Sequence, residues 1–147
     1  MNPFKFPKVI KISHIYVDGS LINGKAGYGI YYGKNDPRNK SVPLSKVSGG
    51  SSQNRSNIRA ELHAVNHALR WTAKKLKKGI VTEPINIYTD STCAIQSTKG
   101  GTTKVAANLK LGWGSIGILH VKAHSGNPGN NAAHKLAQQG AAQDFIE

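Results

Sequence analysis

Short stretches with apolar residues at alternate positions, separated by glycine- and proline-containing turns, dominate the first third of the chain. They predict strands over residues 9–18, 26–32 and 42–47. Gly27 and Gly29 in the second stretch indicate a close approach of another backbone on one face. Because the connections are short, we expect the three strands to form an antiparallel meander.

The pattern then changes to a helical period. Ser56 or Asn57 can cap a helix that continues to about residue 78. Its predicted apolar stripe consists of Leu62, Val65, Leu69 and Leu76. The far end of the helix is basic, with Arg70, Lys74, Lys75, Lys77 and Lys78. These cations suit both a solvated helix C-terminus and a role in contacting phosphates.

The second half of the chain alternates strands and helices. Residues 85–91 predict a strand parallel to the first, because a helix crosses between the two. The elements expected after it are short helices at 91–98 and 104–111, a strand at 115–121, a glycine-rich loop at 123–131 and a closing helix at 132–142. We expect one α/β domain over residues 1–147, with residues 1–8 as a loose lead-in.

Three carboxylates fall on three of these elements. Asp18 and Asp90 end predicted strands, and Glu61 lies near the start of the long helix. The chain has only seven acidic residues. Three of them at the ends of buried elements therefore indicate a functional site rather than ordinary surface charge, and carboxylates suggest a divalent-metal site. The structural alternative is that Asp18 and Asp90 bond local amides and that Glu61 is an N-terminal helix charge.

Charge and composition narrow the possible partners. Twenty lysines and arginines give a net charge of +13 and a pI near 10.0, which favours a polyanion such as nucleic acid over a merely soluble basic protein. No apolar run approaches the roughly 20 residues of a membrane span, so no membrane is expected. The single cysteine, Cys93, fits an intracellular, reducing compartment.

Four motifs in this order resemble type 1 ribonuclease H. They are Tyr16-Val17-Asp18-Gly19-Ser20, Asn57-Ile58-Arg59-Ala60-Glu61-Leu62, Tyr88-Thr89-Asp90-Ser91, and His120-Val121-Lys122-Ala123-His124-Ser125-Gly126 followed by Gly129-Asn130. Residues 33–44 look like the fungal members in particular. Each motif alone is weak, but four at compatible spacing over residues 13–142 are specific. The resemblance implies a ribonuclease H-like fold with a mixed five-stranded sheet of order 3-2-1-4-5, flanked by helices.

The resemblance also implies an activity. It predicts a monomeric endonuclease that cuts the RNA strand of an RNA/DNA hybrid with two Mg²⁺ ions, which would lie about 3.5–4 Å apart. Asp18 would bridge both ions, with Asp90 on the nucleophile side and Glu61 on the leaving-group side. His124 would assist proton movement or product release. The alternative for His124 is a surface histidine with no catalytic role.

One position departs from the family pattern. His134 stands where the family supplies a fourth carboxylate, and no neighbouring acid replaces it. A neutral imidazole can ligate a metal but adds no negative charge, so it suits Mn²⁺ better than Mg²⁺. We therefore expect a weakened hydrolase in which Mn²⁺ substitutes for Mg²⁺. A degraded ribonuclease H-like nucleic-acid-binding module is the alternative. His134 as a plain surface residue is compatible with both.

Substrate binding is a second departure. Residues 99–113 are too few to hold the basic handle that the family often carries, so binding would rest on the general positive field and should depend steeply on salt. The expected nucleic-acid contacts are Asn23, Asn54, Ser56, Asn57, Arg59, Lys74, Lys75 and Lys78. Asn57 would read the minor groove, where the 2′-hydroxyl identifies RNA, but Ile58 replaces the polar residue that commonly follows. A free-standing protein is favoured over a domain of a retroelement polyprotein.

Overall fold

The computed structural model describes residues 9–47, 55–97 and 116–145. Its elements in chain order are β1 (His14–Ile22), β2 (Lys25–Tyr31), β3 (Lys40–Pro43), the 3-10 helix η1 (Leu44–Lys46), α1 (Asn57–Lys77), β4 (Ile85–Thr89), β5 (Ile116–His120) and α3 (Pro128–Ala142). Residues 92–97 are also helical. The expected helix at 104–111 and the lead-in at 1–8 lie outside the described residues.

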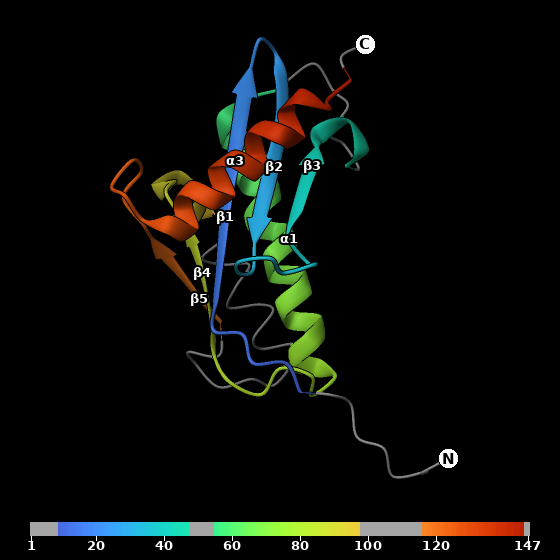
Figure 1. Cartoon of the computed structure of the whole chain (residues 1–147), viewed down its shortest axis with the longest axis vertical. Coiled ribbons are helices and arrows are strands. Elements are labelled where there is room, and N and C mark those ends of the chain that lie inside the picture. Colours follow the sequence, from blue (N-terminus) through green and yellow to red (C-terminus); the bar gives the residue numbers. More distant parts are fainter. Residues whose placement is uncertain (1–8, 48–54, 98–115, 146–147) are drawn as a thin grey trace.

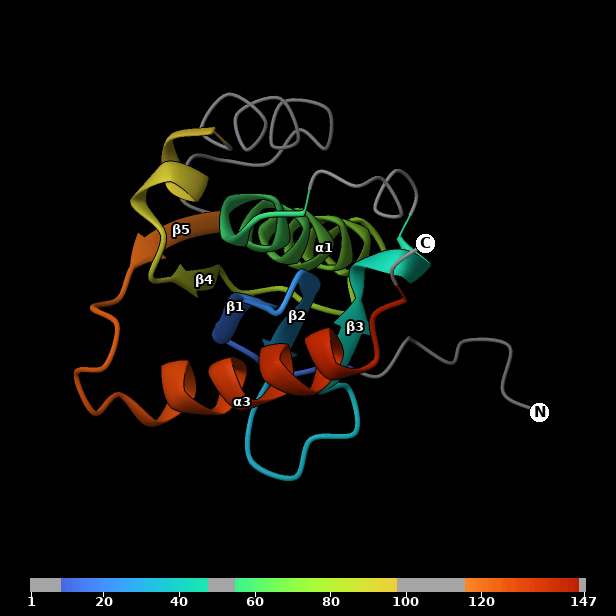
Figure 2. The same ribbon diagram turned by 90° about the horizontal axis from the view of Figure 1, so that it is seen from above.

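The five strands form one mixed sheet in the order β3-β2-β1-β4-β5, which confirms the predicted α/β topology. β1, β2 and β3 pair antiparallel, whereas β4 pairs parallel with both β1 and β5. Figure 2 shows α1 on one face of the sheet and α3 on the other. In Figure 1, α3 crosses the β1–β3 half of the sheet.

The two faces of the sheet are built from different residues. Ile15, Val17, Ile30 and Ile87 are fully buried in the main core beneath α1. Towards α3, Gly27 and Gly29 leave no room for a Cβ, because it would collide with the backbone of α3. These two glycines therefore confirm the predicted close approach of a second backbone.

The apolar stripe of α1 was predicted incorrectly in part. Val65 and Leu69 are buried, but Leu62 and Leu76 are only partly so. The buried face also contains Ala60, Ala64 and Ala68. Leu62 and Leu76 still pack against the core, and the alanines let the helix lie close to the sheet.

Three element boundaries also differ from the prediction. β1 starts at His14 and continues past Asp18 to Ile22, because Asn23 and Gly24 form a two-residue hairpin turn with φ of 52° and 78°. Asp18 therefore lies within a strand rather than at its end. β3 stops at Pro43, where η1 begins.

The third boundary is that of α3, which begins four residues earlier than predicted. Asn127 is its N-cap, accepting a hydrogen bond from the Asn130 N–H, and Pro128 occupies the first turn. His134 is consequently in the second turn of the helix. None of the described helices is long and apolar enough to cross a membrane.

Candidate active site

Asp18, Glu61 and Asp90 come together although they are far apart in sequence. One carboxylate oxygen from each lies within 4.8 Å of the others, and we call these three residues the carboxylate cluster. Asp18 and Glu61 are 3% and 6% exposed, and Asp90 is half-buried. Hard divalent cations prefer oxygen ligands of this kind, so the donor set fits a magnesium-like ion.

The backbone at Gly19 holds two of these carboxylates in place. Its N–H lies 2.9 Å from Asp18 Oδ1 and 3.0 Å from Glu61 Oε1, so both oxygens share this donor. A Cβ at Gly19 would lie 2.6 Å from the Glu61 nitrogen and 2.8 Å from Ala60 Cβ. Only glycine lets the first turns of α1 approach β1 this closely.

Thr89 fixes the second oxygen of Glu61. The Thr89 hydroxyl donates to Glu61 Oε2 at 3.2 Å and accepts from the Ser91 N–H at 3.1 Å. Thr89 is fully buried at the end of β4, directly before Asp90. Thr89, which directly precedes Asp90, thus orients the carboxylate of Glu61.

Acidic groups are crowded together in the carboxylate cluster. Burial, and then the neighbouring Asp18 and Asp90, raise the pKa of Glu61 well above its ordinary value. Burial and then Asp18 also raise the pKa of Asp90. The described residues that line the surrounding cleft, about 470 Å³ in volume, include no lysine or arginine. A bound cation is the missing counter-charge that this arrangement favours.

Two histidines flank the cluster. His134 Nδ1 lies 2.8 Å from Asp18 Oδ2, and because a carboxylate accepts, the imidazole donates this hydrogen bond. The other ring nitrogen, Nε2, remains available to a ligand. His124, at a φ of 55°, places its ring centroid 5.9 Å from that of His134. His134 is not part of the three-residue set that forms the carboxylate cluster.

The predicted nucleic-acid residues are spread over the molecule. Asn57 lines the cleft, and Asn23 lies in the β1–β2 turn beside it. Ser56 is the N-cap of α1 and accepts from the Arg59 N–H, while Arg59 lines a smaller hollow of about 220 Å³. Lys74, Lys75 and Lys78 lie at the opposite end of α1, roughly 20 Å from Glu61 at 1.5 Å per residue. Asn54 is outside the described residues.

The sequence interpretation missed Gln138 and Ile22 of the cleft and considered Ile58 only as a lost polar contact. Gln138 follows His134 by one helical turn and lines the same cleft, a relation that the i, i+4 spacing could have indicated. Ile22 and Ile58 also line it and are 44% and 51% exposed. The cleft wall next to the carboxylates is therefore partly apolar.

A buried ion pair was also missed. Asp144, just after α3, accepts hydrogen bonds from Arg55 Nε at 2.5 Å and from the Ala26 and Ser45 N–H groups at 2.8 Å each. Arg55 directly precedes the N-cap of α1. This pair therefore ties the chain beyond α3 to the start of the helix that carries Asn57 and Glu61.

The fold of the chain is similar to that of two solved structures. The chain superimposes on LC11-RNase H1, isolated from compost, with a TM-score of 0.58 and 18% identity, covering 88% of this chain and 94% of that one. It also matches the protease–reverse transcriptase of prototype foamy virus with a TM-score of 0.56 and 25% identity, over 95% of this chain and 22% of that one.

Sequence comparison points the same way. Ribonuclease H of Schizosaccharomyces pombe is 32% identical over 88% of this chain and 53% of its own length. Ribonuclease H1 of Homo sapiens is 29% identical over 88% of this chain and 50% of its own. The chain thus spans about half the length of these relatives. The family model for RNase H matches residues 11–142, and the chain belongs to the RNase H family.

Proposed function

We propose that this chain is an endonuclease that hydrolyses the RNA strand of RNA/DNA hybrids with the help of divalent metal ions. The observation that carries the proposal is the carboxylate cluster. Three crowded acids lie in an open cleft whose described lining residues include no lysine or arginine, in a chain whose net charge is +13. The names of the relatives, Ribonuclease H and Ribonuclease H1, support the same activity.

In this proposal Asp18, Glu61 and Asp90 would hold the divalent ions. Divalent ions, when bound, supply the charge that favours the attacking water and the leaving 3′-oxygen. The Gly19 N–H and the Thr89 hydroxyl keep the carboxylates oriented. His124 assists proton movement or product release at the cleft edge. Asn57 contacts the minor groove of the hybrid, and we take the chain to act as a monomer.

His134 sets the metal preference in this proposal. Its Nδ1–H donates a hydrogen bond to Asp18. Histidines that bind metals commonly donate one ring N–H to an acceptor and bind the ion through the other ring nitrogen. An imidazole adds no negative charge where the family has a carboxylate, so we propose weaker activity with Mg²⁺ and relatively better activity with Mn²⁺. The second candidate function, a nucleic-acid-binding module without catalysis, is favoured by the same substitution.

Cleavage of a labelled RNA/DNA hybrid in Mg²⁺ and, separately, in Mn²⁺ tests both candidates. We expect the parent to cut, Asp90→Asn to lose roughly 10²–10³-fold in rate, and His134→Asp to be faster than the parent in Mg²⁺. Asp36→Asn is the matched control, because Asp36 is an acid paired with Arg38 outside the cleft. If the parent and His134→Asp bind the hybrid but cut in neither metal, the chain is a binding module.

A further inference from the structure

We propose that the exposed side of α1 is a second nucleic-acid surface, which contacts sugar–phosphate backbone lying outside the cleft. The inference rests on the proposed function for the identity of the polyanion. It adds a surface that contributes to binding of long nucleic acids and takes no part in cleavage. The surface consists of Arg70, Lys74, Lys75 and Lys77 of α1 with Arg38 and Lys40 of the neighbouring chain segment, and we call it the α1 basic ridge.

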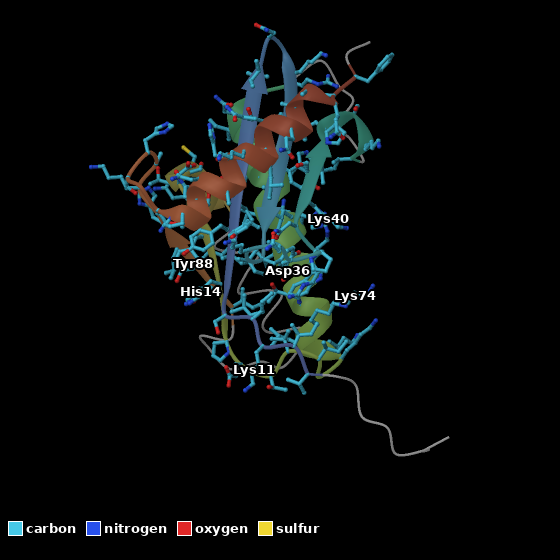
Figure 3. The ribbon with its side chains drawn as sticks, in the orientation of Figure 1. Lys11, His14, Asp36, Lys40, Lys74 and Tyr88 are labelled. Atoms are coloured by element: carbon cyan, nitrogen blue, oxygen red, sulfur yellow. The ribbon has the colours of Figure 1, made fainter. Side chains whose placement is uncertain are left out.

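The helical period places the ridge on one line. Asn66, Arg70, Lys74 and Lys77 are all exposed, and their spacing of four, four and three residues is that of a single face of α1. Figure 1 shows α1 extending far below the level of the α3 helix, and in Figure 3 Lys74 points outward from this lower part. The line therefore leads away from the cleft, roughly 30 Å along the helix from Asn57.

An aromatic centre joins the two parts of the ridge. Arg38 Cζ lies 5.7 Å from the Trp71 ring centroid and 5.5 Å from that of Tyr32, and Lys75 Nζ lies 5.8 Å from Trp71. The Tyr32 and Trp71 rings are 4.9 Å apart. Two cations are thus positioned against a partly exposed tryptophan, an arrangement that suits phosphate and base contacts of a nucleic-acid strand.

Positive charge is concentrated at this place. Burial, followed by the charges of Lys40 and Arg70, lowers the pKa of His67 in the helix face between them. The nearby acid, Asp36, is bonded to Arg38 at 2.6 Å. Within the described part of the chain, no ion pair involves a lysine. Arg38 is therefore paired with an acid, whereas the other cations of the ridge form no ion pair with an acid among the described residues.

Favourable interaction with the helix dipole explains only part of this cluster. Lys74, Lys75 and Lys77 lie in the last turn of α1, where cations are stabilising. Arg70 lies earlier in the helix, and Arg38 and Lys40 come from the chain between β2 and the end of β3. Charge complementarity to a polyanion accounts for all six together.

The test compares two double variants that remove the same charge. R70Q/K74Q changes the ridge, and K46Q/K135Q changes two exposed lysines on η1 and α3. Binding is measured in EDTA, where nothing is cleaved, to hybrids of about 10 and about 30 base pairs and to a long DNA duplex, across a series of salt concentrations. All four positions are exposed, and circular dichroism checks that each variant folds.

We expect R70Q/K74Q to lower the salt slope for the long hybrid by about 2, since each lost phosphate contact accounts for roughly 0.9. Affinity for the long DNA duplex should fall equally, because phosphates carry no sequence or sugar information. Equal losses in K46Q/K135Q, or losses that do not depend on length, would overturn the proposal. A parent that fails to cleave but keeps these binding differences would refute the proposed function alone.

Discussion

The molecule buries acidic side chains in two regions, and their pKa values are shifted in opposite directions. Asp144 is fully buried beside the equally buried Arg55 and two backbone N–H donors. Burial alone raises the pKa of Asp144, but Arg55 and these donors outweigh it and bring the pKa down to about 2. In the carboxylate cluster, burial and neighbouring acids act together, so the pKa values of Glu61 and Asp90 rise.

The difference separates a structural site from a site that needs a ligand. Asp144 has its counter-charge within the protein and stabilises the folded chain. The carboxylate cluster brings like charges together, and the part of its cleft wall that the structure describes holds no lysine or arginine, so its ionised form is costly without a bound cation. Crowding of this kind is what makes the cluster a metal-site candidate.

Breaking the Asp144 ion pair should have the largest effect on stability. Asp144→Ala removes the carboxylate that pairs with the buried Arg55 side chain and accepts from two backbone N–H groups, so we expect a loss of about 3–5 kcal/mol in the free energy of unfolding. Urea denaturation measures it. Asp36→Ala is the control and should change stability by less than about 1 kcal/mol, because the Arg38–Asp36 pair is partly exposed. A loss in Asp144→Ala no larger than in this control would show that the buried ion pair contributes no more to the free energy of unfolding than the partly exposed pair does.

The contribution of Asp144 to the free energy of unfolding should be lost over a defined range of acidic pH. Because the folded-state pKa of Asp144 is depressed from 3.8 to about 2, its contribution is present above pH 4 and disappears as the pH falls towards 2. The shift corresponds to roughly 2 kcal/mol. The difference in stability between the parent and Asp144→Asn, followed by denaturation at pH 2 to 6, should therefore shrink at the acid end. A difference that stays constant over this range would contradict the assignment.

Relieving the carboxylate cluster should have a smaller effect of the opposite sign. Glu61→Gln keeps an acceptor for the Gly19 N–H and removes a carboxyl group whose ionisation is unfavourable. Because the folded-state pKa of Glu61 is raised, the penalty is absent below about pH 4.5 and grows with rising pH. We expect a metal-free gain on the order of 1 kcal/mol at pH 7 that vanishes near pH 4. Thermal denaturation in EDTA would show a loss at pH 7 if the cluster were instead stabilising.

Most strands and the carboxylate cluster were predictable because local signals carry them, whereas the order of the strands in the sheet was implied by the resemblance to ribonuclease H. Alternating apolar residues define the strands, and the chemistry of Asp18, Glu61 and Asp90 stands out in a chain with seven acids. The length of β1 was predicted incorrectly, although its signal was present in the Asn23-Gly24 hairpin turn. The alanine face of α1 was missed because a stripe of large residues was sought instead.

The Asp144 ion pair could not have been predicted in this way. Arg55 and Asp144 are separated by 89 residues and have no spacing or motif that connects them. His134 and Asp18 are 116 positions apart, and it was the family resemblance, not a spacing or motif that joins them, that placed both at one site. Such contacts depend on how α3 lies across the sheet, and the two glycines of β2 indicate only that a close approach occurs.

Metal binding tests the central claim most directly. Calorimetric titration of the parent with Mn²⁺ and with Mg²⁺ should show saturable binding, and Mn²⁺ at a hundred times its Kd should stabilise the fold by about 2.7 kcal/mol. Asp90→Asn should lose at least about tenfold in affinity, whereas Asp36→Asn, which also removes one acid, should bind as the parent does. No saturable binding by the parent, or equal losses in both variants, would contradict the assignment of the carboxylate cluster as a metal site.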